Sequence, residues 1–204
     1  MSHAIELATR ARKPIVIADT QDNPGAGGDS DTTGMLRALV RNNATRAAIG
    51  VICDPRSAKA AHVAGVGATV TLALGGRSGI PGDAPYKESF IVANLSDGQF
   101  VATGPYYSGR AMDMGPPAPL RIGDVRVVVS SHRAQLADQS RYRYVGIEPS
   151  DQSILVNKSS VHFRPDFEPI AESLSISTAR GAMTAAPASM PRNRAGPEMR
   201  GTPG

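Results

Sequence analysis

The chain has 204 residues and a formal net charge of +4, and 41% of its residues are hydrophobic while only 4% are aromatic. This length suits one domain with a sizeable core, or one domain and a tail, with an interior filled mainly by aliphatic side chains. Residues 178–204 hold four arginines and one glutamate, which leaves 18 basic and 17 acidic residues in the nearly neutral first 177, so the composition excludes the clustered basic surface that nucleic-acid binding needs.

Residues 1–13 are predicted to form an N-terminal helix, and the first strand follows it. Residues 15–18 form the continuous apolar run Ile-Val-Ile-Ala, which is typical of a strand covered on both faces in a parallel sheet. The loop after this strand lies at its carboxyl end, which is the edge of an open α/β sheet where ligands bind. We therefore look first to residues 19–33 for function.

The loop over residues 19–33 is rich in glycine and aspartate. Its carboxylates would repel a bare phosphate, and it lacks the Gly-x-x-x-x-Gly-Lys-Ser/Thr spacing, so a nucleotide-binding loop is excluded. A purely structural interpretation stays open for each carboxylate. In it, Asp and Asn side chains shape turns, and Asp31 or Thr32 caps a helix predicted near residues 32–42.

The strand-then-helix pattern continues to residue 74. A strand is predicted at residues 47–53, and Asp54-Pro55 supplies an N-cap and a first-turn proline for a helix near residues 55–64. Residues 68–74 predict a third strand. Three strands joined by two helices predict a parallel sheet with right-handed crossovers.

The cysteine content and the hydropathy of the sequence indicate where in the cell the protein is expected. Cys53 is the single cysteine, so it cannot form an internal disulfide, and we expect it to be a small buried side chain at a strand end. The N-terminus lacks the charged segment and apolar core of a signal peptide. No apolar run approaches the roughly 20 residues that span a bilayer, so a cytoplasmic protein without a membrane segment is expected.

The second half of the sequence is rich in strand signals. One antiparallel hairpin is predicted from residues 89–95 and 99–103 around Asp97-Gly98, and another from residues 120–122 and 125–131 around Gly123-Asp124. Residues 104–117, rich in Gly and Pro, predict an ordered loop. The expected fold class is therefore α/β, with a parallel strand-helix-strand unit and added antiparallel β-hairpins.

A polar loop follows a short strand predicted at residues 154–156, after a helix expected near residues 138–145. This loop concentrates a base, hydroxyls, an imidazole and a guanidinium over residues 157–164. His162 is the histidine we expect to be functional, because ionisable groups gathered at a strand's carboxyl end are candidates for binding or proton transfer. Residues 178–204 are expected to be an extended or disordered tail that contains Pro and Arg.

Two kinds of catalytic centre find little support within the chain. The histidines lie at positions 3, 62, 132 and 162, and none belongs to a His-Glu-x-x-His or His-x-His pattern, so we expect no complete zinc site in this chain. Gly-x-Ser-x-Gly is absent. Although Ser159 lies near Lys158 and His162 in the sequence, adjacency alone does not establish a nucleophile with its base.

Several motifs taken together, in this order, resemble the C-terminal domain of the MlrC family, the microcystinase C-like metallopeptidases that degrade microcystins. The resemblance extends from about residue 14 to about residue 183. The motifs that carry it are Ala18-Asp19-x-x-Asp22-Asn23-Pro24-Gly25, Asp54-Pro55, Gly65-Val66-Gly67-Ala68, Leu74-Gly75-Gly76, Asp97-Gly98 and Lys158-Ser159-Ser160-Val161-His162-Phe163-Arg164.

The resemblance implies that residues 14–177 are an MlrC C-terminal-like domain and that residues 1–13 are the remnant of an interdomain connection. It implies a zinc-dependent hydrolase whose metal ligands lie in a preceding N-terminal domain, missing here or separately encoded. This chain would then be an accessory domain without a cofactor of its own. It would support that partner and help to form a peptide-substrate cleft, for which the candidate residues are Asp19, Asp22, Asn23, Lys158, Ser159 and His162.

Other interpretations remain open on the sequence alone. The chain could be a stand-alone, non-catalytic binding module that uses the same two loops to hold a small polar or peptide ligand. It could also be an unproductive remnant of a truncated gene. In the accessory interpretation we expect the isolated chain to be inactive as a peptidase.

Overall fold

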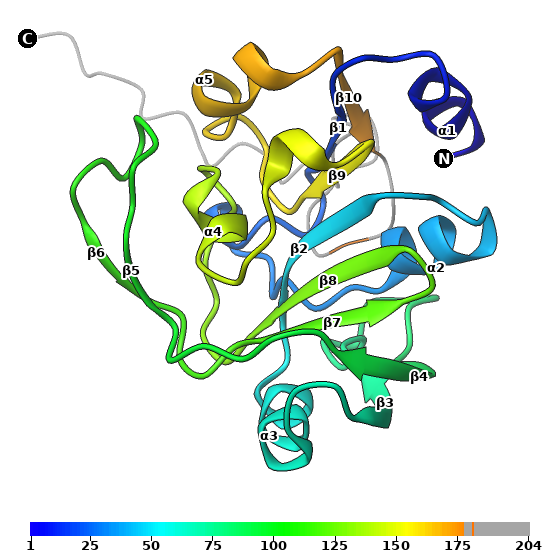
Figure 1. The fold of residues 1–204 in the computed structure, drawn as a ribbon, viewed down its shortest axis with the longest axis vertical. Helices are drawn as coiled ribbons and strands as arrows, with labels where there is room; N and C mark the ends of the chain where they lie inside the picture. The colour runs from blue at the N-terminus through cyan, green and yellow to red at the C-terminus, as the bar shows by residue number, and fades with distance from the viewer. Residues whose placement is uncertain (178–180, 182–204) are drawn as a thin grey trace, which may run out of the picture.

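An eight-stranded sheet runs through the part of the chain that the computed structural model describes, residues 1–177 and residue 181 (Figure 1). In spatial order its strands are β10 (Ser173–Ser177), β1 (Ile15–Asp19), β9 (Ile154–Asn157), β2 (Ala47–Cys53), β8 (Val125–Ser130), β7 (Ala118–Ile122), β4 (Tyr86–Val92) and β3 (Thr69–Leu74). From β10 to β8 all neighbours are parallel, and from β8 to β3 all are antiparallel. The predicted α/β fold class is confirmed.

Helices cover both faces of this sheet. Residues of α1 (Ser2–Ala8), α2 (Gly34–Arg41) and α3 (Pro55–Ala64) pack into the apolar cluster on one face. Residues of α4 (Ser140–Arg143) and α5 (Arg164–Phe167) pack into the cluster on the other. Short 3-10 helices lie at Pro24–Ala26 (η1), Pro149–Asp151 (η2) and Glu168–Ile170 (η3).

Burial of strand β1 on both faces explains why its sequence is apolar at every position and does not alternate. Ile15 and Ile17 belong to the cluster beneath α2, whereas Val16 and Ala18 belong to the cluster that contains Phe163. Because successive strand residues point to opposite faces, a strand covered by helices on both sides must be apolar at every position. The prediction that this strand is buried on both faces is confirmed.

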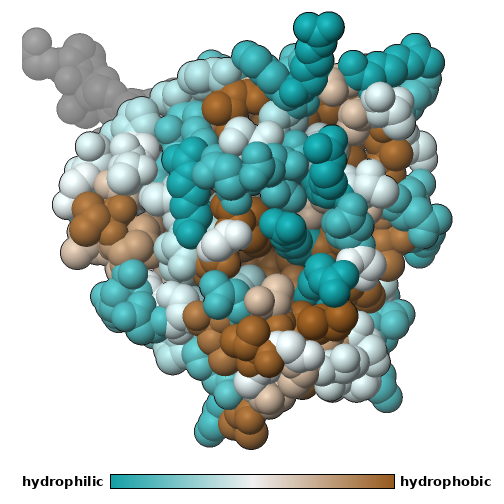
Figure 2. All heavy atoms as spheres, viewed as in Figure 1, coloured by the Kyte–Doolittle hydropathy of each residue, from teal (hydrophilic) through white to brown (hydrophobic). Residues whose placement is uncertain are grey.

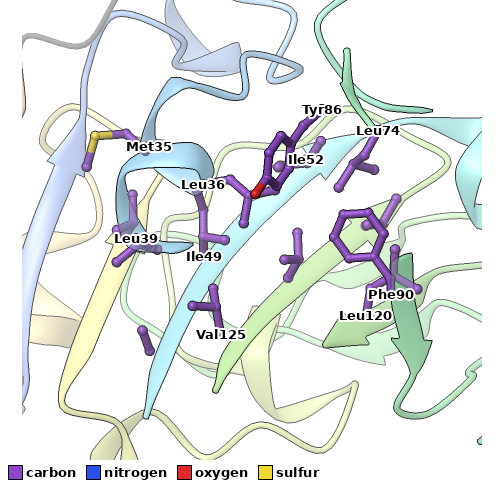
Figure 3. Packing of buried hydrophobic residues seen from close by; sticks show 14 of the residues in the cluster. Met35, Leu36, Leu39, Ile49, Ile52, Leu74, Tyr86, Phe90, Leu120 and Val125 are labelled. Atoms are coloured by element: carbon purple, nitrogen blue, oxygen red, sulfur yellow. The ribbon is translucent and has the colours of Figure 1, made fainter. Parts of the chain in front are cut away.

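The larger cluster joins the parallel and antiparallel parts of the sheet. Leu36 of α2 and Ile52 of β2 lie near Tyr86 of β4, and Phe90 of the same strand extends the cluster toward Leu74 (Figure 3). The rings of Tyr86 and Phe90 meet edge to face with centroids 6.3 Å apart. These side chains bind the antiparallel strands to the same core as the parallel strands.

The third predicted strand exists, but its expected direction is wrong. Strand β3 pairs antiparallel with β4 at the far edge of the sheet, and it contacts neither β1 nor β2 as a ladder partner. Its burial alternates weakly, with mostly exposed or half-buried residues, as suits an edge strand. The strand-helix-strand pattern could not distinguish this arrangement from a parallel crossover.

One of the two predicted hairpins is confirmed. Strands β7 and β8 pair around Gly123-Asp124. The hairpin predicted around Asp97-Gly98 is wrong, because β4 pairs with β3 and β7, while β5 (Gln99–Val101) pairs with β6 (Ala111–Asp113). This β5–β6 ribbon projects to the left of the main sheet in Figure 1 and supplies a regular strand where a loop was expected.

The helix starts agree only in part with the sequence. Asp54 caps α3 as predicted, since its Oδ1 accepts a hydrogen bond from the Ser57 N–H at 3.1 Å. The expected cap of α2 by Asp31 or Thr32 is wrong, because the N-cap is Thr33. Helix α4 is shorter than the helix expected near residues 138–145, and β10 was not expected at all.

The surface in the view of Figure 1 is largely polar, with apolar side chains gathered in the lower part, near α3 and β4 (Figure 2). Among the described residues, no helix combines the length and hydropathy needed to cross a bilayer. The expected tail lies almost entirely outside the described residues, and the proposed domain boundaries stay predictions.

Candidate functional site

The candidate residues of the two polar loops come together at one edge of the sheet. Asp19 is the last residue of β1, and Lys158 follows Asn157, the last residue of β9. These strands are parallel neighbours, with Ala18 in register with Asn157. The carboxyl ends of two strands that are 135 residues or more apart in the sequence therefore meet, as carboxyl ends of neighbouring parallel strands must.

Lys158 is the centre of this site and is fully buried. Its Nζ donates hydrogen bonds to Asp19 Oδ2 at 3.0 Å, to Asp22 Oδ2 at 2.8 Å and to Thr32 Oγ1 at 2.9 Å. An ammonium group has three protons to donate, and here each has an acceptor. We call Lys158, Asp19, Asp22 and Thr32 the lysine cluster.

The charges of the lysine cluster stabilise one another. Burial lowers the pKa of Lys158, but the carboxylates of Asp19 and Asp22 outweigh that effect and raise it above its usual value. Burial likewise raises the pKa of Asp22, while the charge of Lys158 and the hydrogen bonds from Lys158 and Thr32 bring it below its usual value. Lys158 therefore stays protonated and is no general base or nucleophile.

Asp22 also fixes the course of the glycine-rich loop. Its Oδ1 accepts the Ser30 N–H at 2.8 Å, and its Oδ2 accepts both the N–H and the hydroxyl of Thr32 at 2.8 Å. One buried carboxylate thus holds both ends of the segment between residues 22 and 32. This is the turn-shaping role that the sequence left open, and it also joins the loop to Lys158.

A layer of neutral hydrogen bonds lies next to the lysine cluster. Asn23 Nδ2 donates to Ser160 Oγ at 2.9 Å, which joins the first loop to the second. Gln135 Nε2 donates to Ser159 Oγ at 2.9 Å and lies 3.0 Å from Nδ1 of His162. All six candidate residues consequently belong to one connected arrangement.

His162 lies on the exposed side of this arrangement. Its ring stacks on Tyr106 with centroids 4.1 Å apart, and both residues are exposed, as is the neighbouring Val161. We call Tyr106, Val161 and His162 the aromatic edge. The site therefore has two parts, a closed and charged foundation and an open, partly apolar surface above it.

A second set of polar contacts joins the loops on the other side of the glycine-rich segment. Asp31 Oδ2 accepts the backbone N–H groups of Arg77 and Ser78, while Asp54 Oδ2 accepts the Gly75 N–H at 2.9 Å and pairs with Arg77 at 2.8 Å. Beside them is an open hollow of about 660 Å³, lined by residues that include Asp29, Cys53, His132 and Arg133. Burial raises the pKa of the Cys53 thiol to about 11, so this thiol is not an activated nucleophile.

The donors of this site do not suit a metal ion. Within the described part of the chain, no three His, Cys, Asp or Glu side chains are placed to hold one. In the lysine cluster, the ammonium group of Lys158 already takes the position between Asp19 and Asp22 that a cation would need. A zinc-dependent step can therefore not be derived from these residues.

Sequence reasoning missed three contributors to the site. Thr32 was considered only as a helix cap, Gln135 belongs to no recognisable pattern, and Tyr106 lies in a segment expected to be a loop. Only Thr32 had a usable signal in the sequence. It lies two residues before α2, and Ser and Thr side chains near helix starts often form hydrogen bonds with nearby groups. For Gln135 and Tyr106 the sequence held no comparable signal.

Comparisons with known proteins show which sequences and structures this chain is similar to. Residues 17–194 match the family described as MlrC C-terminus. Microcystinase C from Sphingomonas sp is 29% identical over 175 residues, which are 83% of this chain and 33% of that protein. A crystal structure from Mesorhizobium sp. BNC1, solved as that of a candidate metallopeptidase, superposes with a TM-score of 0.85 and 26% identity over 96% of this chain and 39% of that chain. The chain thus spans about a third of the curated relative's length.

Proposed function

Because the chain belongs to the MlrC C-terminus family, we propose that it is the accessory C-terminal domain of an MlrC-like zinc metallopeptidase. In this role it supports a partner domain that carries the zinc ligands and the catalytic groups, and it contributes one wall of the cleft that holds a peptide substrate. The relatives are two to three times longer than the part that this chain matches, which leaves room for such a partner.

The observation that supports this proposal best is the pairing of a rigid foundation with an exposed surface. The lysine cluster is closed to solvent and fully engaged, so it fixes the two loops without offering a reactive group. The aromatic edge above it is accessible, and Val161 is 55% exposed. A surface held on a rigid base is suited to positioning another domain or a substrate.

The test is a complementation experiment with the part of microcystinase C that this chain does not match. That part would be produced alone, mixed with the 204-residue chain, and fused to it, and zinc-dependent cleavage of a linear peptide would be measured for each. We expect the fusion to cleave and the part alone to be markedly weaker. Equal cleavage by the part alone and by the fusion would contradict the accessory role.

A matched pair of variants tests where the partner docks. Val161→Asp places a charge in the aromatic edge, while Val63→Asp places one on α3, where Val63 is 82% exposed. We expect Val161→Asp to lower complementation by about tenfold, as a buried interfacial charge should, and Val63→Asp to leave it unchanged. Equal effects of the two substitutions would remove the aromatic edge from the interface.

The second candidate function is a stand-alone binding module for a small polar or peptide ligand. The hollow beside Cys53 and Arg133, at the same sheet edge, is the observation that favours it. A thermal-shift panel of peptides separates the two functions. Stabilisation by a peptide together with no stabilisation by the partner domain would favour the module, and stabilisation by the partner domain would favour the accessory role.

A further inference from the structure

Arg141 is a buried cation whose hydrogen-bonding capacity is only partly used. It lies on α4, has no exposed surface, and donates from Nη1 to the sulfur of Met114 at 2.7 Å. Its guanidinium stands over the rings of Phe100 and Tyr107, at 5.8 Å and 5.1 Å from their centroids. Nε and Nη2 have no hydrogen-bond partner among the described residues.

The two unpartnered nitrogens lie on the same side of the guanidinium group. Nε–H and the adjacent Nη2–H point in parallel and form the fork that binds a carboxylate through two hydrogen bonds. A buried charge without such partners costs free energy. The protein therefore keeps a desolvated two-donor fork whose hydrogen-bonding capacity the described residues leave unused.

The nearby carboxylate of Asp138 does not bond to this fork. Burial lowers the pKa of Arg141, while the charge of Asp138 and a side-chain hydrogen bond with Tyr107 act in the opposite direction. No carboxylate in the described part of the chain forms an ion pair with Arg141. Asp138 accepts from Ser140 through Oδ1, and its Oδ2 also lacks a hydrogen-bond partner among the described residues.

Arg141 lines a hollow of about 560 Å³ at the same sheet edge as the lysine cluster. This volume lies in the range of small-molecule sites, about 300–1,000 Å³. The other walls come from the glycine-rich loop at Gly25 and Gly28, from Tyr107 and Met112 of the segment that carries β6, and from Arg133 and Gln135. Because Arg141 has no exposed surface, a ligand reaches the fork only if a wall of the hollow moves, and the flexible side chain of the half-buried Met112 is one such wall.

We propose that this hollow binds the carboxylate group of a small ligand, with its two oxygens accepting from Nε and Nη2 of Arg141. A planar carboxylate matches the two parallel donors of the fork, and its flat face can lie against the Tyr107 wall. The group could be the C-terminal carboxylate of a peptide or an acidic side chain. Gln135 lines the hollow and also contacts Ser159 and His162, so a bound ligand would lie next to the candidate site.

This inference does not depend on the accessory role, because every wall of the hollow comes from this chain. The test is isothermal titration of the full 204-residue chain with N-acetyl-dialanine and with its C-terminal amide. N-acetyl-aspartate diamide, which carries no free carboxylate at its terminus or side chain, N-acetyl-aspartate amide with a free side-chain carboxylate, and inorganic phosphate complete the panel. We expect the free carboxylates to bind about 10- to 100-fold more tightly than the amides, as charge-assisted hydrogen bonds allow.

Variants assign the binding to Arg141. Arg141→Lys keeps the charge but removes the fork, and we expect it to lose the preference for acid over amide. Ala134→Phe narrows the mouth of the hollow from a half-buried position without changing Arg141, so it tests the proposal even if Arg141→Lys does not fold. Arg110→Lys, at an exposed position outside the hollow, is the matched control and should bind as the wild type does.

The titration panel also separates the sources of the carboxylate. Tighter binding of N-acetyl-dialanine would indicate a peptide C-terminus, and tighter binding of N-acetyl-aspartate amide would indicate an acidic side chain, and both support the proposal. Equal binding of acids and amides, no binding of either, tighter binding of phosphate, or unchanged binding by both Arg141→Lys and Ala134→Phe would overturn it.

Discussion

At the scale of single residues, Lys158 carries a positive charge without any exposed surface, and its stability depends on its partners being charged as well. Asp19 and Asp22 each contribute one oxygen to it, and the Thr32 hydroxyl contributes the third acceptor. Removing one member of such a group costs far more than an exposed ion pair would, because the remaining charges stay buried. The loss of any one charged member of the lysine cluster should therefore destabilise the folded protein strongly.

Lys158→Met should be among the most destabilising single substitutions in this chain. It retains much of the side-chain volume but leaves Asp19 and Asp22 facing each other without a counter-charge, so we expect a loss of about 3–5 kcal/mol in the free energy of unfolding. Urea denaturation followed by circular dichroism measures it. Lys59→Met, at an exposed position of α3, is the control and should change that free energy by less than about 0.5 kcal/mol.

The same measurement on Lys158→Met combined with Asp19→Asn and Asp22→Asn shows whether charge is the cause. Neutral amides in place of the carboxylates should recover part of the lost stability, because no unpaired charge is then buried. If the triple variant is less stable than Lys158→Met alone by the sum of the separate effects, the charge-based explanation is wrong.

The pH dependence of stability follows from the same pKa shifts. Asp22 and Asp54 have pKa values below their usual range in the folded protein, since hydrogen bonds and nearby cations outweigh burial. The unfolded chain therefore binds protons more readily, and the stability that these groups supply is complete above the unfolded pKa of about 4 and is lost as the pH falls through their folded values.

The contribution of Lys158 to stability changes with pH in the opposite direction. Its folded pKa is raised, so its contribution is complete below the unfolded value of about 10.4 and is lost as the pH rises through the folded value. Urea titrations across the pH range should show an acid limb and an alkaline limb, and Asp54→Asn should flatten the acid limb. An unfolding free energy that stays constant from about pH 6 to about pH 3 would contradict this assignment.

At the scale of elements, the turn after β3 has to come close to the glycine-rich loop. Gly75 has φ 56°, and a Cβ atom at this position would lie 2.3 Å from the carbonyl oxygen of Asp31. Its N–H donates to Asp54 at the same time. Both the backbone conformation and the close approach therefore require glycine here, which explains the Leu74-Gly75-Gly76 motif in physical terms.

Gly75→Ala and Gly123→Ala form a matched pair that separates these two requirements. Gly123 also has φ 56°, but a Cβ atom there would meet nothing within 4 Å. We expect Gly123→Ala to cost about 1 kcal/mol for the left-handed conformation alone, and Gly75→Ala to cost clearly more because Asp31 must move. Midpoints of thermal unfolding that shift equally in the two variants would show that the close approach is not a constraint.

The local elements show how far sequence patterns can predict this fold. The apolar run in β1, the Asp54-Pro55 start of α3 and the Gly123-Asp124 hairpin are local signals, and the structure has each of them. The wrong hairpin has a different cause, since β4 pairs with β7 rather than with the adjacent β5, which pairs with β6. No local signal indicated that residues 89–92 would pair with β3 and β7 instead of continuing into a hairpin.

At the scale of the whole molecule, the insertion of β9 between β1 and β2 creates the site. The sequence predicted that both polar loops follow strands, but it did not predict that these strands are neighbours. That order brings Lys158 against Asp19 and Asp22, and it places His162 on the exposed side. The position of the candidate residues after strands could thus be predicted from the sequence, whereas their division into a buried cluster and an exposed surface required the long-range strand order.

The accessory role also belongs to this scale, because it concerns what the chain can do with and without a partner. Among the described residues, no three His, Cys, Asp or Glu side chains are placed to bind a metal ion. The carboxylates of the lysine cluster form ion pairs with Lys158. In the proposed accessory role, such a domain positions a surface and the partner supplies the metal ligands.

The most direct test is zinc-dependent peptide cleavage measured for the purified 204-residue chain and for its fusion to the unmatched part of microcystinase C. We predict that the chain alone has no activity above that of a chelator-treated sample, and that the fusion cleaves a linear peptide in a zinc-dependent manner. Cleavage by the chain alone that disappears with a chelator and with His162→Ala would contradict the account.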